Sequence, residues 1–179
     1  KSIYNVYNIL AAWSVCSLAG ADKAVMARVI NNYVLKNGRM VRFTIGSHHG
    51  TLLTSKHENS VAYNTNLGYI AQRAEPCEVL IIVDAISRKY FTGETSWLWD
   101  IDFNQLNCAH VEKVILCGKY ANDLAMRFDC TEIPGEKTVC CDTVPQAVQL
   151  LEGDGDAALY VVTCFSDRDK LLNLAKREG

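Results

Sequence analysis

The stretch TGETSWLWDIDF, residues 92–103, combines two large aromatic side chains with two carboxylates. Trp97 and Trp99 are one residue apart, and Asp100 and Asp102 follow them. A tryptophan is costly to leave in water, whereas a carboxylate is costly to bury unpaired. Two interpretations are open, and they are compatible with each other. In the first, the tryptophans anchor a loop in which Asp100 caps the following helix, residues 101–106. In the second, they pack so that Asp100 is held in one orientation for chemistry.

The elements that must position this stretch follow from the hydrophobic pattern. Residues 3–34 have helical periodicity with a break near Gly20, and Asp22 is a fair N-cap for the second piece. From about residue 40, apolar runs of strand length alternate with helical segments. This pattern predicts an α/β fold, an open and mostly parallel sheet of about five or six strands with helices on both faces. We expect strands at 41–46, 51–55, 77–85, 111–118, 137–142 and 157–165, and helices at 60–74, 119–128, 144–153 and 167–178, the last capped by Ser166 or Asp167.

The tryptophan stretch falls at the functional edge of such a sheet. In open parallel sheets, ligands bind beyond the carboxyl ends of the strands. The segment from Asp84 to Ser96 leaves one of these ends, and its 13 residues are long for a strand-to-helix loop. Position therefore supports a functional role for Asp100.

Composition limits the classes of function. With 179 residues, 49% hydrophobic and 21% charged, the chain suits one domain, perhaps with a small appendage. A net charge of −2 gives no basic surface for nucleic acid, and the apolar runs are too short to span a bilayer. The eight cysteines contain no CxxC pair and several lie in apolar runs, which favours reduced thiols and a cytoplasmic protein. The start reads as the cut edge of a longer protein, with no targeting segment.

Other groups of reactive residues are weaker. His48 and His49 are expected on a hairpin turn, and with His57 and Glu58 they have no fixed metal-ligand spacing, so no metal site is predicted. Cys108 and His110 read as loop residues, and GDGDA at 153–157 reads as a turn.

SWLWDIDF, together with YNVYNILAA and NGRM, resembles the MurT family, the Mur ligase-like subunits of lipid II isoglutaminyl synthase. The resemblance covers essentially the whole chain, and the tryptophan–aspartate element is its specific part. It implies that residues 1–38 are the end of a central ATPase domain and that residues 39–179 are a Rossmann-like Mur ligase C-terminal domain. It also implies nucleotide contacts by Asn5, Asn8 and Arg39, with ATP and Mg²⁺ bound in the full-length protein. The sequence has no GxxxxGK[ST] phosphate loop, so no cofactor is expected on this fragment alone, which should be inactive.

The chain departs from this family at two loops. SKHENSVAYN replaces a Lys-Asn-Pro-Ala-Gly-like segment, where Lys56 can still be matched as a nucleotide contact. FTGETS replaces an Asp-Gly-Arg-Asp-like loop and leaves Glu94 as its acid.

The resemblance implies two functions that the residues alone do not separate. One is part of an ATP-dependent amidotransferase that amidates the D-glutamate of lipid II with ammonia from a GatD-like glutaminase. The other is a non-catalytic docking domain for that glutaminase. We expect Asp100 to face the glutaminase, where a carboxylate would orient the catalytic histidine, with Glu94 and Asp102 as the alternatives. An unrelated nucleotide-binding α/β domain is disfavoured, because no glycine-rich loop follows a strand.

Overall fold

The computed structural model describes residues 6–33, 39–56, 59–85, 93–151 and 157–177. The chain divides into two compact units, Lys1–Gly38 and Arg39–Gly179. Their assignment to the two Mur ligase domains stays a prediction.

The first unit is a pair of helices, α1 (Val6–Leu18) and α2 (Lys23–Asn32), as the periodicity predicted. Asp22 is the N-cap of α2, where its carboxylate accepts from the Val25 backbone N–H at 2.9 Å. Helix α1 has no buried residue, although most of its side chains are apolar.

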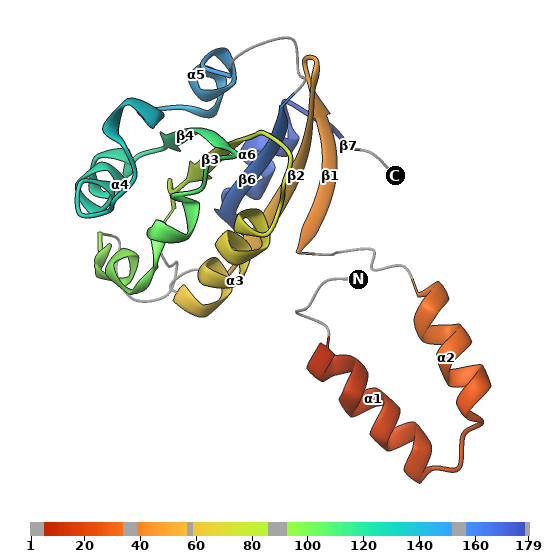
Figure 1. Ribbon diagram of the computed structural model, residues 1–179. Coiled ribbons are helices and arrows are strands. Elements are labelled where there is room, and N and C mark those ends of the chain that lie inside the picture. The colour runs from red at the N-terminus through yellow and green to blue at the C-terminus, as the bar shows by residue number, and fades with distance from the viewer. Residues whose placement is uncertain (1–5, 34–38, 57–58, 86–92, 152–156, 178–179) are drawn as a thin grey trace. The chain divides into compact units, whose positions relative to one another are not determined.

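The second unit is built on one seven-stranded sheet in the order β5-β4-β3-β6-β2-β1-β7 (Figure 1). The five strands from β5 to β2 are mutually parallel, and β1 and β7 add an antiparallel edge. This confirms the predicted α/β class with a mostly parallel sheet. The strands are β1 (Met40–Ile45), β2 (His48–Ser55), β3 (Cys77–Ile82), β4 (Val111–Cys117), β5 (Thr138–Cys141), β6 (Ala158–Cys164) and β7 (Lys176–Arg177).

Helices cover both faces of the sheet. Successive residues of a strand point to opposite faces, and in the central strands both sets are apolar, so both faces must be covered. Along β3, Val79 and Ile81 face one core, whereas Leu80 and Ile82 face the other. The first core packs against α3 and α4, and the second packs against α5 and α6; Figure 1 shows α3 in front of the sheet and α6 behind it. The helices are α3 (Ser60–Ala71), α4 (Ala121–Phe128), α5 (Val144–Gln149) and α6 (Arg168–Leu172), with 3₁₀ turns η2 (Ser96–Asp100), η3 (Phe103–Leu106) and η4 (Gly135–Lys137).

Three local predictions are wrong. His48 and His49 lie in β2 and not on a turn, because the hairpin turns earlier, at Gly46, whose φ is +58°. The terminal helix ends at Leu172, since the chain then extends into β7 and pairs with β1. The segment predicted as a helix at 101–106 forms only the 3₁₀ turn η3.

All eight cysteines are free thiols. Within the described ranges, no helix combines the length and apolar character needed to cross a bilayer.

Candidate functional site

The acidic segment, residues 94–102, contains η2 and packs on the first core through one of its two tryptophans. Trp97 is 7% exposed, and its ring lies 5.2 Å from that of Tyr63 in α3. Trp99 is 56% exposed, so the expectation that both tryptophans pack on the domain is wrong. The short 3₁₀ turn is the reason: it buries Trp97 and Leu98 and turns Trp99 and Asp100 to the surface.

Two side chains from neighbouring helices hold the backbone of this segment. From α3, the Asn64 amide donates to the Asp100 carbonyl at 3.3 Å and accepts from the Asp102 N–H at 2.8 Å. From α4, Arg127 donates to the Ile101 carbonyl at 3.0 Å. Its guanidinium also lies 5.5 Å from the centre of the Trp99 ring, within the range of a cation–π contact.

The Asp100 carboxylate is exposed on this braced backbone. Among the described residues it has no hydrogen-bond or ion-pair partner. Asp100 is the last residue of η2, so its predicted role as the N-cap of the next helix is wrong. Asp102 holds the N-cap position of η3, but its side chain makes no capping bond there. An exposed carboxylate on a backbone that is held in place can accept a hydrogen bond from another molecule.

Glu94 is already engaged within the segment. Its carboxylate accepts from the Ser96 backbone N–H at 2.7 Å. Hydrogen bonds from the hydroxyl and the backbone of Ser96 hold the pKa of Glu94 below its ordinary value of 4.5. Glu94 is therefore less available to an outside donor than Asp100 is.

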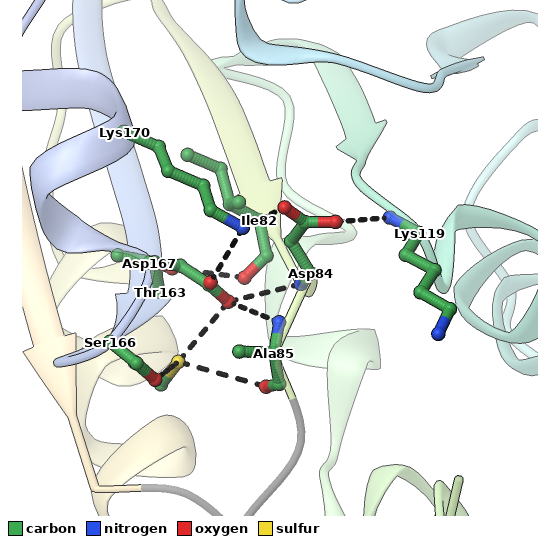
Figure 2. A network of polar contacts seen from close by, with 9 residues as sticks. Ile82, Asp84, Ala85, Lys119, Thr163, Ser166, Asp167 and Lys170 are labelled. Carbon is green, nitrogen blue, oxygen red and sulfur yellow. Dashed lines mark hydrogen bonds and ion pairs between the residues drawn. The ribbon is translucent and has the colours of Figure 1, made fainter. Parts of the chain in front are cut away.

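The sequence analysis missed a buried polar network around Asp167, drawn in Figure 2. The Asp167 side chain is fully buried, and one of its oxygens accepts from the backbone N–H of Asp84 at 3.0 Å and of Ala85 at 2.9 Å. The Cys164 thiol is 3.2 Å from the same oxygen, and burial raises its pKa to about 11, so it stays protonated and can donate. The prediction of Asp167 as a helix cap had the position right, but its side chain makes no capping bond.

Lys170 and Asp84 extend the network toward solvent. The Lys170 ammonium lies 3.2 Å from Asp167 and also pairs with Asp84. Burial lowers the pKa of Lys170, whereas the two neighbouring carboxylates favour its charged form. The other Asp84 oxygen accepts from the Lys119 N–H at 2.8 Å, so the network ties together the ends of β3, β4 and β6 (Figure 2).

The network lies at a switch point of the sheet. The chain leaves β3 toward the face of α3 and α4, whereas it leaves the neighbouring β6 toward α6 on the opposite face. Crevices at such points bind ligands in open α/β sheets. A cavity of about 390 Å³ opens here, with two carboxylates and one ammonium on its wall, which disfavours a phosphate ligand. It is lined by Ile82, Asp84, Gly118, Asp142, Thr143, Val144, Pro145, Lys170, Asn173 and Leu174.

Comparison with known proteins gives the family of the chain. Residues 57–167, more than half of it, match the model of the family described as MurT ligase C-terminal. The chain belongs to this family. The match includes all three predicted acids of the acidic segment.

Two curated relatives agree with the family match, and both are named lipid II isoglutaminyl synthase (glutamine-hydrolyzing) subunit MurT. The relative from Streptococcus pneumoniae R6 is 26% identical over 165 residues, which are 92% of this chain and 36% of that protein. The relative from Staphylococcus aureus COL is 28% identical over 131 residues, 73% of this chain and 29% of that protein. The chain thus spans about a third of its relatives' length. A solved UDP-N-acetylmuramoyl-L-alanyl-D-glutamate–2,6-diaminopimelate ligase is also similar, with 13% identity and a TM-score of 0.49 over 90% of this chain and 33% of that one.

Two of the nucleotide-binding residues predicted from the MurT resemblance come together. The Arg39 carbonyl accepts from the Thr54 N–H at 2.7 Å, so Arg39 and the exposed Lys56 lie at the same end of the β1–β2 hairpin. Asn8 is exposed on α1, and Asn5 lies outside the described residues. All four stay predictions.

The remaining sequence candidates make ordinary local contacts. The Cys108 thiol donates to the Gln105 carbonyl at 3.2 Å, and the His110 ring is 3.2 Å from the Ile70 carbonyl. No group of three metal-ligating side chains exists within the described ranges. His57, Glu58 and most of GDGDA lie outside them.

Proposed function

We propose that the chain is the C-terminal part of an ATP-dependent, Mur ligase-like subunit that amidates the D-glutamate of lipid II in the bacterial cytoplasm. In this reaction the ligase subunit would activate the glutamate carboxyl group as an acyl phosphate. Ammonia released from glutamine by a GatD-like partner would then attack the carbonyl carbon and displace phosphate. The family match and the names of the two curated relatives support this proposal.

Asp100 is the residue of this chain that we assign to the partner's reaction. A glutaminase uses a cysteine nucleophile and a histidine base, and the histidine needs an acceptor that fixes its tautomer and stabilises its charged form. The observation that carries the assignment is the exposed Asp100 carboxylate on a backbone held from two helices. The exposed Trp99 beside it offers an aromatic contact of the kind enriched at protein interfaces.

The nucleotide would be held mostly by residues outside this chain. Arg39 and Lys56, at one end of the β1–β2 hairpin, could contribute positive charge toward phosphates. The sequence has no phosphate loop, and the described residues hold no cluster of carboxylates for Mg²⁺. The chain fits ATP only as a contributor, so we expect no low-micromolar ATP binding by residues 1–179 in calorimetry.

The test is the glutaminase turnover of a complex between the complete gene product and its glutaminase. Asp100→Asn removes the negative charge but keeps the size of the side chain. By analogy with other histidine-orienting carboxylates, we expect kcat to fall by about 10³–10⁴-fold. Asp102→Asn, two residues away, is the matched control and should retain turnover.

A docking domain without a role in catalysis is the alternative, favoured by the exposed Trp99 beside the acidic segment. It predicts that Asp100→Asn leaves kcat unchanged, whereas Trp99→Ala weakens assembly. Normal turnover of Asp100→Asn at saturating partner concentration would therefore remove the catalytic assignment.

A further inference from the structure

One side chain, Asn64, bridges the turn that carries Asp100. Its amide nitrogen donates to the Asp100 carbonyl oxygen at 3.3 Å, and its amide oxygen accepts from the Asp102 N–H at 2.8 Å. The two bonds run in opposite directions, so the side chain must donate and accept at neighbouring atoms, as a carboxamide does. The bonds fix the backbone on both sides of Ile101, next to the residue that bears the carboxylate.

The helix that carries Asn64 is itself fixed to the sheet. The Asn59 side chain caps α3 by accepting from the Ala62 N–H at 2.9 Å. Two residues beyond Asn64, the buried Asn66 donates to the hydroxyl of Ser55, at the end of β2, with a distance of 2.9 Å. Buried contacts therefore set the position of Asn64 relative to the sheet, and the Asp100 turn is held to that position.

The opposite side of the turn is held independently by Arg127 of α4. Arg127 bonds the Ile101 carbonyl, which Asn64 does not contact. Its guanidinium also lies 5.8 Å from the centre of the Phe103 ring. Loss of Asn64 would thus free the Asp100 and Asp102 ends of the turn, while Ile101 stays attached to α4.

We propose that Asn64 is a positioning residue for the Asp100 carboxylate. The inference rests on the proposed function, in which Asp100 meets the glutaminase histidine. Asn64 touches no reacting atom. It limits the backbone freedom around Asp100, so that the carboxylate is already oriented when the partner binds.

The test uses two variants of Asn64 and one control in the reconstituted complex. Asn64→Ala removes both bonds. Asn64→Asp keeps an acceptor for the Asp102 N–H but loses the donor to the Asp100 carbonyl and adds a negative charge beside it. Thr65→Val is the control, because the Thr65 hydroxyl bonds within α3 to the Val61 carbonyl at 2.7 Å.

Two measurements report on separate steps. In hydrogen exchange, the Asp102 amide should exchange at least tenfold faster in Asn64→Ala and keep its protection in Asn64→Asp and Thr65→Val. In kinetics, kcat for glutamine hydrolysis should fall by about 10–100-fold in both Asn64 variants, by analogy with the loss of residues that orient metal ligands. The KM for glutamine and the Kd of the complex should stay within twofold.

The outcomes separate this proposal from the proposed function. If Asp100→Asn loses turnover and Asn64→Ala does not, Asn64 is no positioning residue but Asp100 keeps its role. If Asp100→Asn has normal turnover, the assignment of Asp100 to the partner's reaction and this inference both fail, whereas the amidating function of the whole subunit does not depend on this result. Unchanged exchange of the Asp102 amide in Asn64→Ala would show that the bridge does not hold the turn in solution, which overturns the inference alone. In the Asp100→Asn background, Asn64→Ala should cause no further loss of kcat.

Discussion

Asp167 and Asp100 are held in opposite ways within one sheet-based unit. Asp167 is fully buried, and its carboxylate is satisfied by two backbone N–H groups, a thiol and an ammonium. Asp100 is exposed, and its backbone is bound by Asn64 while its carboxylate has no partner among the described residues. The charge of Asp167 is therefore used inside the protein to hold the fold. Around Asp100 the protein holds only the backbone and leaves the charged group available to another molecule.

A structural carboxylate is hydrogen-bonded through its own oxygens, whereas a functional carboxylate has free oxygens and a backbone that is hydrogen-bonded. A buried charge survives only when its partners offset the lost hydration, so its removal damages the fold. An exposed carboxylate on a fixed backbone contributes little to folding, but costs little ordering when another molecule binds it. The two aspartates should therefore respond oppositely in stability and in activity.

The largest expected effect on stability is that of Asp167→Ala. It leaves the buried N–H groups of Asp84 and Ala85 without their acceptor, and we expect a loss of about 3–5 kcal/mol in the free energy of unfolding. Urea denaturation followed by tryptophan fluorescence measures this. Asp169→Ala is the matched control, since Asp169 is exposed and pairs only with Arg168 among the described residues, and should change stability by less than about 0.5 kcal/mol. A loss below about 1 kcal/mol for Asp167→Ala would contradict the structural role.

Lys170→Met should have an intermediate effect. The ammonium pairs with Asp84 and Asp167, but the Lys170 side chain is 43% exposed, which weakens both interactions. We expect a loss of about 1–2 kcal/mol, measured in the same way. In an Asp167→Asn background the loss should be smaller, because the two residues share one network. Additive losses would show that Lys170 stabilises the fold independently of Asp167.

Asp100→Asn should leave stability unchanged within about 0.5 kcal/mol, because the Asn64 bonds go to the backbone and survive the substitution. Equilibrium unfolding of this variant in urea, measured as for Asp167→Ala, checks this. A loss above about 1.5 kcal/mol would mean that the Asp100 carboxylate has a structural partner after all.

The sequence was sufficient for the mostly parallel sheet, although it missed β7, but not for the conformation of the acidic segment or for the Asp167 network. Strands such as β3 are buried on both faces, and their continuous apolar runs can be recognised without tertiary information. Trp97 is buried and Trp99 is exposed because a 3₁₀ turn, not an α-helix, determines which residues of this segment face the core. Asp167 appeared as a helix cap because its true partners, Asp84 and Ala85, are more than 80 positions away in the chain. The order of the strands in the sheet brings Asp167 close to these partners, and the sequence does not contain that order. The available signal for the network was a charged residue shortly after a buried strand.

The smallest expected effect concerns Glu94, the acid of the segment that is bonded locally. Because Ser96 lowers its pKa in the folded state, the ionised form stabilises the fold. This contribution is fully present above the ordinary pKa of 4.5 and is lost as the pH falls through the lowered value. The difference in urea midpoint between the native chain and Glu94→Gln should therefore be larger at pH 7 than at pH 3. Ser96→Ala removes the hydroxyl donor but keeps the backbone N–H, so an NMR titration should show the pKa of Glu94 rising toward 4.5 without reaching it. An unchanged pKa in Ser96→Ala would show that the hydroxyl bond is absent and that the backbone N–H of Ser96 alone holds the Glu94 carboxylate.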